Sequence, residues 1–105
     1  MQPFSSAEAG SLPAALDMMA ANGAMPIAGG TDMLQLLQED VLAPETLVGI
    51  GRLPFAGVEV DAEGARIGAM ARLAAVADDE RIQRRYPLLA QALMETASPQ
   101  VRNAA

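Results

Sequence analysis

Two adjacent glycines lie between an apolar run and a stretch with helical spacing, and this feature constrains the fold most strongly. The run is Met25 to Ala28, and the glycines are Gly29 and Gly30. Apolar residues then recur at helical spacing from Met33 to about Glu39, and a second apolar run covers Leu47 to Ile50. A strand, a glycine turn, a helix and another strand predict a βαβ-like start.

The residues before this start predict another helix. Ser11 can cap it, and Pro13 fits its first turn because amides there lack intrahelical acceptors. Asn22-Gly23 is expected to end it, as glycine commonly does after a helix. Residues 5–10 have the composition of a polar connection. The apolar face of the helix is expected to consist of Leu12, Ala15, Leu16 and Met19.

The second half of the chain predicts a β-hairpin followed by helices. Val58 and Val60 alternate with acidic residues, and residues 61–64 have turn composition before a returning strand at 65–68. We expect Ile67 on the same face as the two valines. Helices are expected at 73–77, 78–85 and 87–96, and from Ser98-Pro99 onward. The expected fold class is therefore α+β.

Composition excludes several functions. The 105 residues include no cysteine and no histidine, so thiol catalysis, Ser–His triads and Cys/His zinc sites are excluded within this chain. All seven basic residues are arginines, which excludes a Schiff-base lysine. The net charge of −6 argues against nucleic-acid binding. The chain contains no apolar run of membrane-spanning length and no visible secretory signal, so we expect a cytoplasmic protein, with the periplasm as the alternative.

The glycine turn is the one local candidate for a binding site. Successive glycines allow a ligand to approach the main chain closely, and amides at a helix start suit a phosphate or pyrophosphate. The Thr31 hydroxyl can add a donor. The sequence matches neither Gly-x-Gly-x-x-Gly nor the Walker pattern. The alternative is a tight turn in which Thr31 or Asp32 only caps the helix.

Two charged groups have simpler structural explanations than a role in chemistry. Asp78-Asp79-Glu80 opens a helix, where acidic side chains complement the helix dipole, and no partner ligands for a metal accompany it. We expect Arg81, Arg84 and Arg85 to form a solvated face, with Glu80 and Arg84 spaced for an i,i+4 pair. No catalytic side chain and no metal ligand is predicted.

Several segments together resemble the FAD-binding domains of molybdopterin dehydrogenases, which include those of xanthine dehydrogenase and of the medium subunit of carbon monoxide dehydrogenase. The glycine turn and its flanks are similar to the first flavin-binding loop of that family. The resemblance covers nearly the whole chain, in the family's order, at 26–34, 47–50, 66–73, 86–89 and 97–105.

The resemblance implies a flavin domain of the vanillyl-alcohol-oxidase or PCMH type, of which residues 1–105 would be the N-terminal part. The family's second glycine loop would begin after Ala105. The first loop of the family holds the FAD pyrophosphate through main-chain amides, and the strand end at Ile67 would lie near the flavin. The implied cofactor-binding residues are Ile27, Ala28, Gly29, Gly30, Thr31, Asp32, Met33 and Ile67.

The same resemblance implies an oxidoreductase in which the flavin passes electrons from iron–sulfur clusters to an acceptor. The expected partners are a large molybdopterin-binding subunit and a small iron–sulfur subunit. The alternative is a non-catalytic binding or assembly module that does not hold FAD by itself. We also expect an unpaired sheet edge to promote self-association.

Overall fold

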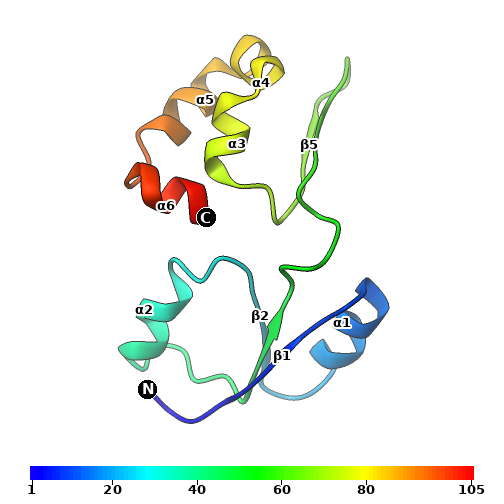
Figure 1. The fold of residues 1–105 in the computed structure, drawn as a ribbon, viewed down its shortest axis with the longest axis vertical. Helices are drawn as coiled ribbons and strands as arrows, with labels where there is room; N and C mark the ends of the chain where they lie inside the picture. Colours follow the sequence, from blue (N-terminus) through cyan, green and yellow to red (C-terminus); the bar gives the residue numbers. More distant parts are fainter. The chain divides into compact units, whose positions relative to one another are not determined.

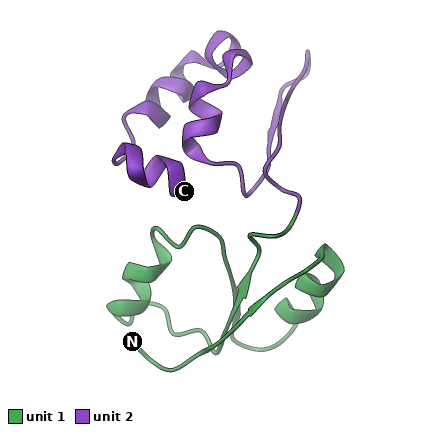
Figure 2. Ribbon diagram, viewed as in Figure 1, with its two compact units in different colours: residues 1–53 green, residues 54–105 purple.

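The computed structural model describes all 105 residues, and these form two compact units, Met1–Leu53 and Pro54–Ala105 (Figures 1 and 2). The first contains a parallel sheet and two helices, and the second an antiparallel hairpin and four helices. This mixture confirms the expected α+β class. No helix has the length and apolar character needed to cross a membrane.

The first unit is built on a three-stranded parallel sheet with β3 at its centre. The order across the sheet is β1-β3-β2, and β2, α2 and β3 form the predicted βαβ start. Buried Leu47 and Val48 of β3, with Leu37 of α2, form much of its core. The elements are β1 (Ser5–Glu8), α1 (Leu12–Met19), β2 (Ala24–Ile27), α2 (Met33–Gln38) and β3 (Thr46–Gly49).

Strand β1 was not expected, since residues 5–10 were predicted as a polar connection. Its side chains are all exposed, so no alternation of apolar residues marks it in the sequence. Main-chain hydrogen bonds stabilise it instead: Ser5 N donates to Glu45 O at 2.9 Å, and Ala9 N donates to Gly49 O at 3.0 Å. The prediction was wrong because an edge strand can be defined by its partner strand alone.

Helix α1 has the predicted start but not the predicted buried face. The Ser11 Oγ accepts from Ala14 N at 3.2 Å, which confirms the N-cap. Ala15 is buried, but Leu12 and Leu16 are 45% and 62% exposed, so the face prediction was wrong for both leucines. The helix therefore turns its Ala15 side toward the interior.

The second unit contains the hairpin of β4 (Val58–Val60) and β5 (Ala65–Ile67), which the sequence predicted. Val58 and Val60 pack against a core of Val76, Ile82 and Ala90. Ile67 lies opposite Val58 and is 41% exposed. The four helices are α3 (Leu73–Asp78), α4 (Glu80–Arg85), α5 (Pro87–Met94) and α6 (Pro99–Ala104).

Candidate functional site

The predicted loop lies in the first unit, directly between β2 and α2. Ala28, Gly29 and Asp32 are exposed, whereas Gly30 and Thr31 are half-buried. Strand β2 places the loop through Ile27, whose carbonyl accepts from Ile50 N at 3.1 Å just beyond β3. The loop therefore follows the carboxyl end of a strand that is anchored to the centre of the sheet.

The main-chain amides of the loop are free. Those of residues 29–33 donate to no acceptor in the protein, although the carbonyls of Gly30 and Asp32 accept from Leu34 N at 3.1 Å and Leu36 N at 3.2 Å. These two bonds form the first turn of α2, and the N–H groups before it have no intrahelical acceptor. Consecutive unpaired amides of this kind carry partial positive charge and bind anions.

Gly30 has a left-handed main-chain conformation, with φ at +74°. A Cβ at this position would lie 3.5 Å from the Leu34 Cγ and 3.6 Å from the Ile27 Cδ1, which are ordinary contact distances. The requirement for glycine therefore comes from the backbone conformation and not from crowding. The positive φ is what turns the chain from β2 into α2.

The side chains of the loop do not cap the helix. Asp32 occupies the N-cap position of α2 but makes no side-chain cap hydrogen bond. No protein group pairs with the Thr31 hydroxyl either. The purely structural alternative, in which Thr31 or Asp32 serves as a cap, therefore lacks the hydrogen bond that it requires.

An anion with several oxygens fits this loop. The segment offers six hydrogen-bond donors: the five main-chain amides of residues 29–33, which have no protein acceptor, and the unpaired Thr31 hydroxyl. Gly29 is exposed, so a ligand can reach the main chain there. A pyrophosphate accepts hydrogen bonds and needs no basic side chain at a site of this kind. Ile27 and Met33, both half-buried, flank the loop on its strand and helix sides.

The remaining predicted site residue, Ile67, belongs to the second unit. It ends β5, and the chain then passes through Gly68, whose amide donates to Gly57 O at 2.9 Å. A Cβ on Gly68 would lie 2.1 Å from the Phe55 carbonyl oxygen, so the strand end requires glycine for space. The eight predicted residues thus fall into one continuous segment, 27–33, and one separate position.

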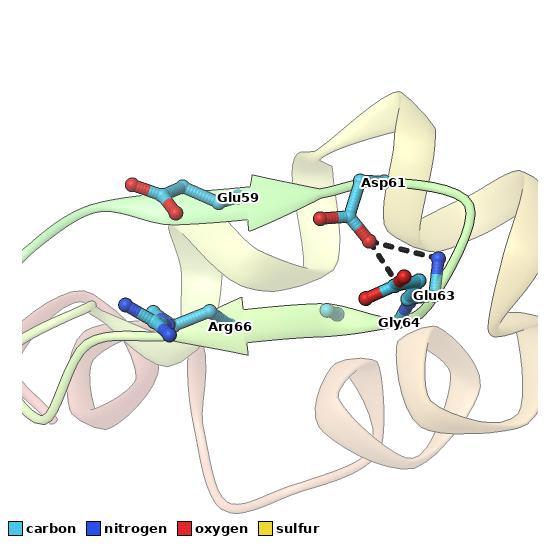
Figure 3. A pocket seen from close by; sticks show the side chains of 6 residues that line it. Glu59, Asp61, Glu63, Gly64 and Arg66 are labelled. Carbon is cyan, nitrogen blue, oxygen red and sulfur yellow. Dashed lines mark hydrogen bonds between the residues drawn. The ribbon is translucent and has the colours of Figure 1, made fainter.

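A shallow pocket of about 310 Å³ lies on the hairpin (Figure 3). Acidic Glu59, Asp61 and Glu63 line it together with Arg66. The Asp61 Oδ1 accepts from Glu63 N at 2.9 Å and from Gly64 N at 3.1 Å, so it is used by the turn itself. No group of His, Cys, Asp or Glu side chains is arranged to hold a metal ion.

Arg81, Arg84 and Arg85 of α4 are all exposed, which confirms the predicted solvated face, but the expected Glu80–Arg84 pair is absent. Arg81 forms a salt bridge to Asp79, with 2.7 Å between Nη2 and Oδ2, and Arg85 donates to the carbonyl of Asp61. The hydrogen bond from Arg81 lowers the pKa of Asp79 from 3.8 to about 2. Helical spacing alone could not have revealed partners more than 20 residues away.

Comparison with known proteins gives one consistent result. Residues 2–105 match the family described as the FAD binding domain in molybdopterin dehydrogenase. The FAD-binding subunit of an aldehyde oxidoreductase from Escherichia coli is 42% identical over 93 residues, which are 88% of this chain and 29% of that subunit. The carbon monoxide dehydrogenase medium chain from Hydrogenophaga pseudoflava is 36% identical over 78 residues, or 73% of this chain and 27% of that one.

Solved structures agree with these sequence relatives. Carbon monoxide dehydrogenase from Hydrogenophaga pseudoflava has a TM-score of 0.90 at 30% identity, over 99% of this chain and 37% of that one. Quinoline 2-oxidoreductase from Pseudomonas putida 86 also has a TM-score of 0.90, at 26% identity and the same coverage of both chains. The chain thus spans well under half the length of the proteins that it resembles.

Proposed function

The chain belongs to the family of FAD-binding domains in molybdopterin dehydrogenases, and from this we propose that its glycine loop binds the pyrophosphate of FAD. The unpaired amides of residues 29–33 carry the proposal, because a pyrophosphate is an acceptor that they can share. The proposed cofactor-binding residues are Ile27, Ala28, Gly29, Gly30, Thr31, Asp32, Met33 and Ile67.

Each part of the loop has a distinct task in this proposal. The left-handed Gly30 turns the chain so that successive N–H groups face one ligand. The Thr31 hydroxyl donates an additional hydrogen bond, and Ile27 and Met33 exclude water from the two sides of the loop. When bound, FAD supplies an isoalloxazine ring that accepts and releases electrons.

The function of the whole protein follows from the family. We infer a flavin-containing part of a molybdopterin-dependent oxidoreductase, whose flavin relays electrons from iron–sulfur clusters to an acceptor. Its partners would be a large molybdopterin-binding subunit and a small iron–sulfur subunit. Such a division of tasks agrees with a chain that offers main-chain donors for a cofactor and has no histidine, cysteine or lysine.

Titration of FAD into the 105-residue chain tests the loop assignment. We expect the largest chemical-shift changes in a ¹⁵N–¹H spectrum at the amides of residues 29–33. Gly30→Ala should abolish these changes because alanine disfavours a φ of +74°. Gly51→Ala is the matched control, since a Cβ there meets no atom within 4 Å. Changes concentrated outside the loop would contradict the assignment.

The affinity in the same titration separates this chain from a module that does not hold FAD by itself. A dissociation constant of about 1 µM or lower corresponds to about −8 kcal/mol and would oppose the module alternative. We expect much weaker binding, since the chain spans only 29% of its relative in Escherichia coli and supplies one phosphate-binding loop.

Self-association is a separate proposal. The exposed β1 presents an unpaired edge of the sheet, and Leu16 and Leu88 are 62% and 79% exposed. Unpaired edges and exposed apolar side chains both favour association. Light scattering should show species larger than a monomer as the protein concentration rises, and a monomer at all concentrations would contradict this proposal.

A further inference from the structure

The outer edge of β4 is held by arginines of α4. Gly57 and Gly68 form a hydrogen-bonded pair, as do Asp61 and Gly64 at the other end of the hairpin. Hydrogen-bonded and non-hydrogen-bonded pairs alternate in an antiparallel ladder, so Val58 and Ile67 form a non-hydrogen-bonded pair. The carbonyl of Val58 therefore points away from β5, toward the free edge.

The Arg81 side chain donates a hydrogen bond to this carbonyl. Its Nη2 donates to Val58 O at 2.9 Å, across a sequence separation of 23 residues. Four residues later on the same helix, Arg85 donates to the carbonyls of Asp61 and Ala62. Two successive turns of α4 thus bind the main chain of the hairpin at its start and at its tip.

Asp79 fixes the direction of the Arg81 guanidinium. The Arg81 Nε donates to Asp79 Oδ1 at 3.1 Å, and Nη2 donates to Oδ2 at 2.7 Å, which is a bidentate fork. The same carboxylate caps α4 by accepting from Arg81 N at 2.9 Å. Asp79 is only 16% exposed, and its two functions hold the guanidinium rigidly relative to the helix.

We propose that Arg81, oriented by Asp79, is a positioning residue that holds Val58 and thereby positions Ile67 for contact with the flavin. This rests on the proposed FAD site. In a non-hydrogen-bonded pair the two side chains lie close together on one face, so a shift of Val58 moves Ile67 with it. Arg81 itself touches no cofactor in this proposal.

Two variants separate the charge of Arg81 from its bidentate hydrogen bonds to Asp79, and a third variant is the control. Arg81→Gln removes both, whereas Arg81→Lys keeps the charge but loses the bidentate geometry. Arg84→Gln is the matched control, because Arg84 lies on the same short helix and its side chain makes no hydrogen bond or salt bridge. Amide hydrogen exchange at Gly68 in the 105-residue chain should be about tenfold faster in Arg81→Gln, less affected in Arg81→Lys and unchanged in Arg84→Gln.

The second readout is one that a merely structural residue would not change. We expect saturating FAD to shift the Ile67 δ1-methyl resonance by the ring current of the isoalloxazine. That shift should fall at least twofold in Arg81→Gln and recover in part in Arg81→Lys. The response of the loop amides, 29–33, should be the same in all variants.

The outcomes distinguish this inference from the proposed function. An Ile67 methyl shift that is unchanged in Arg81→Gln, with a normal loop response, overturns the positioning role alone. A titration in which neither the loop nor Ile67 responds to FAD overturns the FAD site and the flavin contact together. If amide hydrogen exchange at Gly68 is unchanged in both Arg81 variants, the claim that Arg81 holds the hairpin is overturned, regardless of the response to FAD.

Discussion

Replacing Gly68 by alanine tests the packing of the hairpin against the segment that enters it. An ideal Cβ at Gly68 would lie 2.1 Å from the Phe55 carbonyl oxygen and 2.6 Å from its carbonyl carbon. Both are main-chain atoms, so no side-chain rotation relieves the overlap. The same carbonyl accepts from Met70 N at 2.8 Å, which ties it to the strand end.

The magnitude follows from what must move. The overlap requires separation by almost an ångström, which breaks or lengthens the hydrogen bond from Met70. One lost hydrogen bond contributes about 1 kcal/mol, and overpacking of a closed site about 1–3 kcal/mol. We therefore expect Gly68→Ala to lower the free energy of unfolding by about 2–4 kcal/mol. Gly57→Ala should change it by less than about 0.5 kcal/mol, because a Cβ there meets nothing within 4 Å.

Urea denaturation followed by tyrosine fluorescence measures this difference in unfolding free energy for the second unit, which contains both Gly68 and Tyr86. Tyr86 is the only tyrosine, the chain has no tryptophan, and Tyr86 packs against the core beside the hairpin. The expected loss corresponds to a midpoint lower by about 1–3 M in Gly68→Ala. Equal midpoints for Gly68→Ala and Gly57→Ala would contradict the close approach of Gly68 to the Phe55 carbonyl.

Two further predictions concern charge and backbone strain in the second unit. The pKa of Asp79 is lowered from 3.8 to about 2, so its contribution to stability is present above about pH 4 and lost as the pH falls from 4 through 2. A carboxyl ¹³C titration should show this low pKa, and Arg81→Gln should return the pKa of Asp79 toward 3.8. An unchanged Asp79 pKa in Arg81→Gln would contradict the bidentate hydrogen bonding from Arg81. Ala97 has a φ of +50°, so Ala97→Gly should raise the free energy of unfolding by about 0.5–1 kcal/mol, and a loss of stability in thermal denaturation would contradict the strain.

Local chemistry predicted the helix starts well. Ser11 and Ser98 each accept a hydrogen bond from the amide three residues on, as their positions before a proline-containing first turn indicated. The hairpin was also predictable, because Val58 and Val60 alternate with exposed charges and a turn sequence follows. These features depend on residues close together in the chain.

Features that depend on distant partners were not predictable. Strand β1 exists because β3 pairs with it, and its four exposed side chains carry no apolar pattern. The hydrogen bond from Arg81 to Val58 crosses 23 residues, and Leu12 and Leu16 lie on the outer side of α1 despite their helical spacing. In each case tertiary packing decides which of several locally acceptable arrangements forms.

For the proposed site, the sequence indicated the glycine loop, and the structure adds its free amides and the positive φ of Gly30. What the sequence left open was whether Thr31 or Asp32 simply caps α2. The absence of a side-chain cap removes the basis for that alternative.

The proposed function depends on the binding of a pyrophosphate by the main-chain amides of residues 29–33. The most direct measurement is a pair of ¹⁵N–¹H titrations of the 105-residue chain, one with ADP and one with riboflavin. ADP contains the diphosphate without the flavin, and riboflavin contains the flavin without any phosphate. We expect saturable shifts of the loop amides with ADP and none at these positions with riboflavin. Loop shifts with riboflavin alone, or none with ADP, would contradict it.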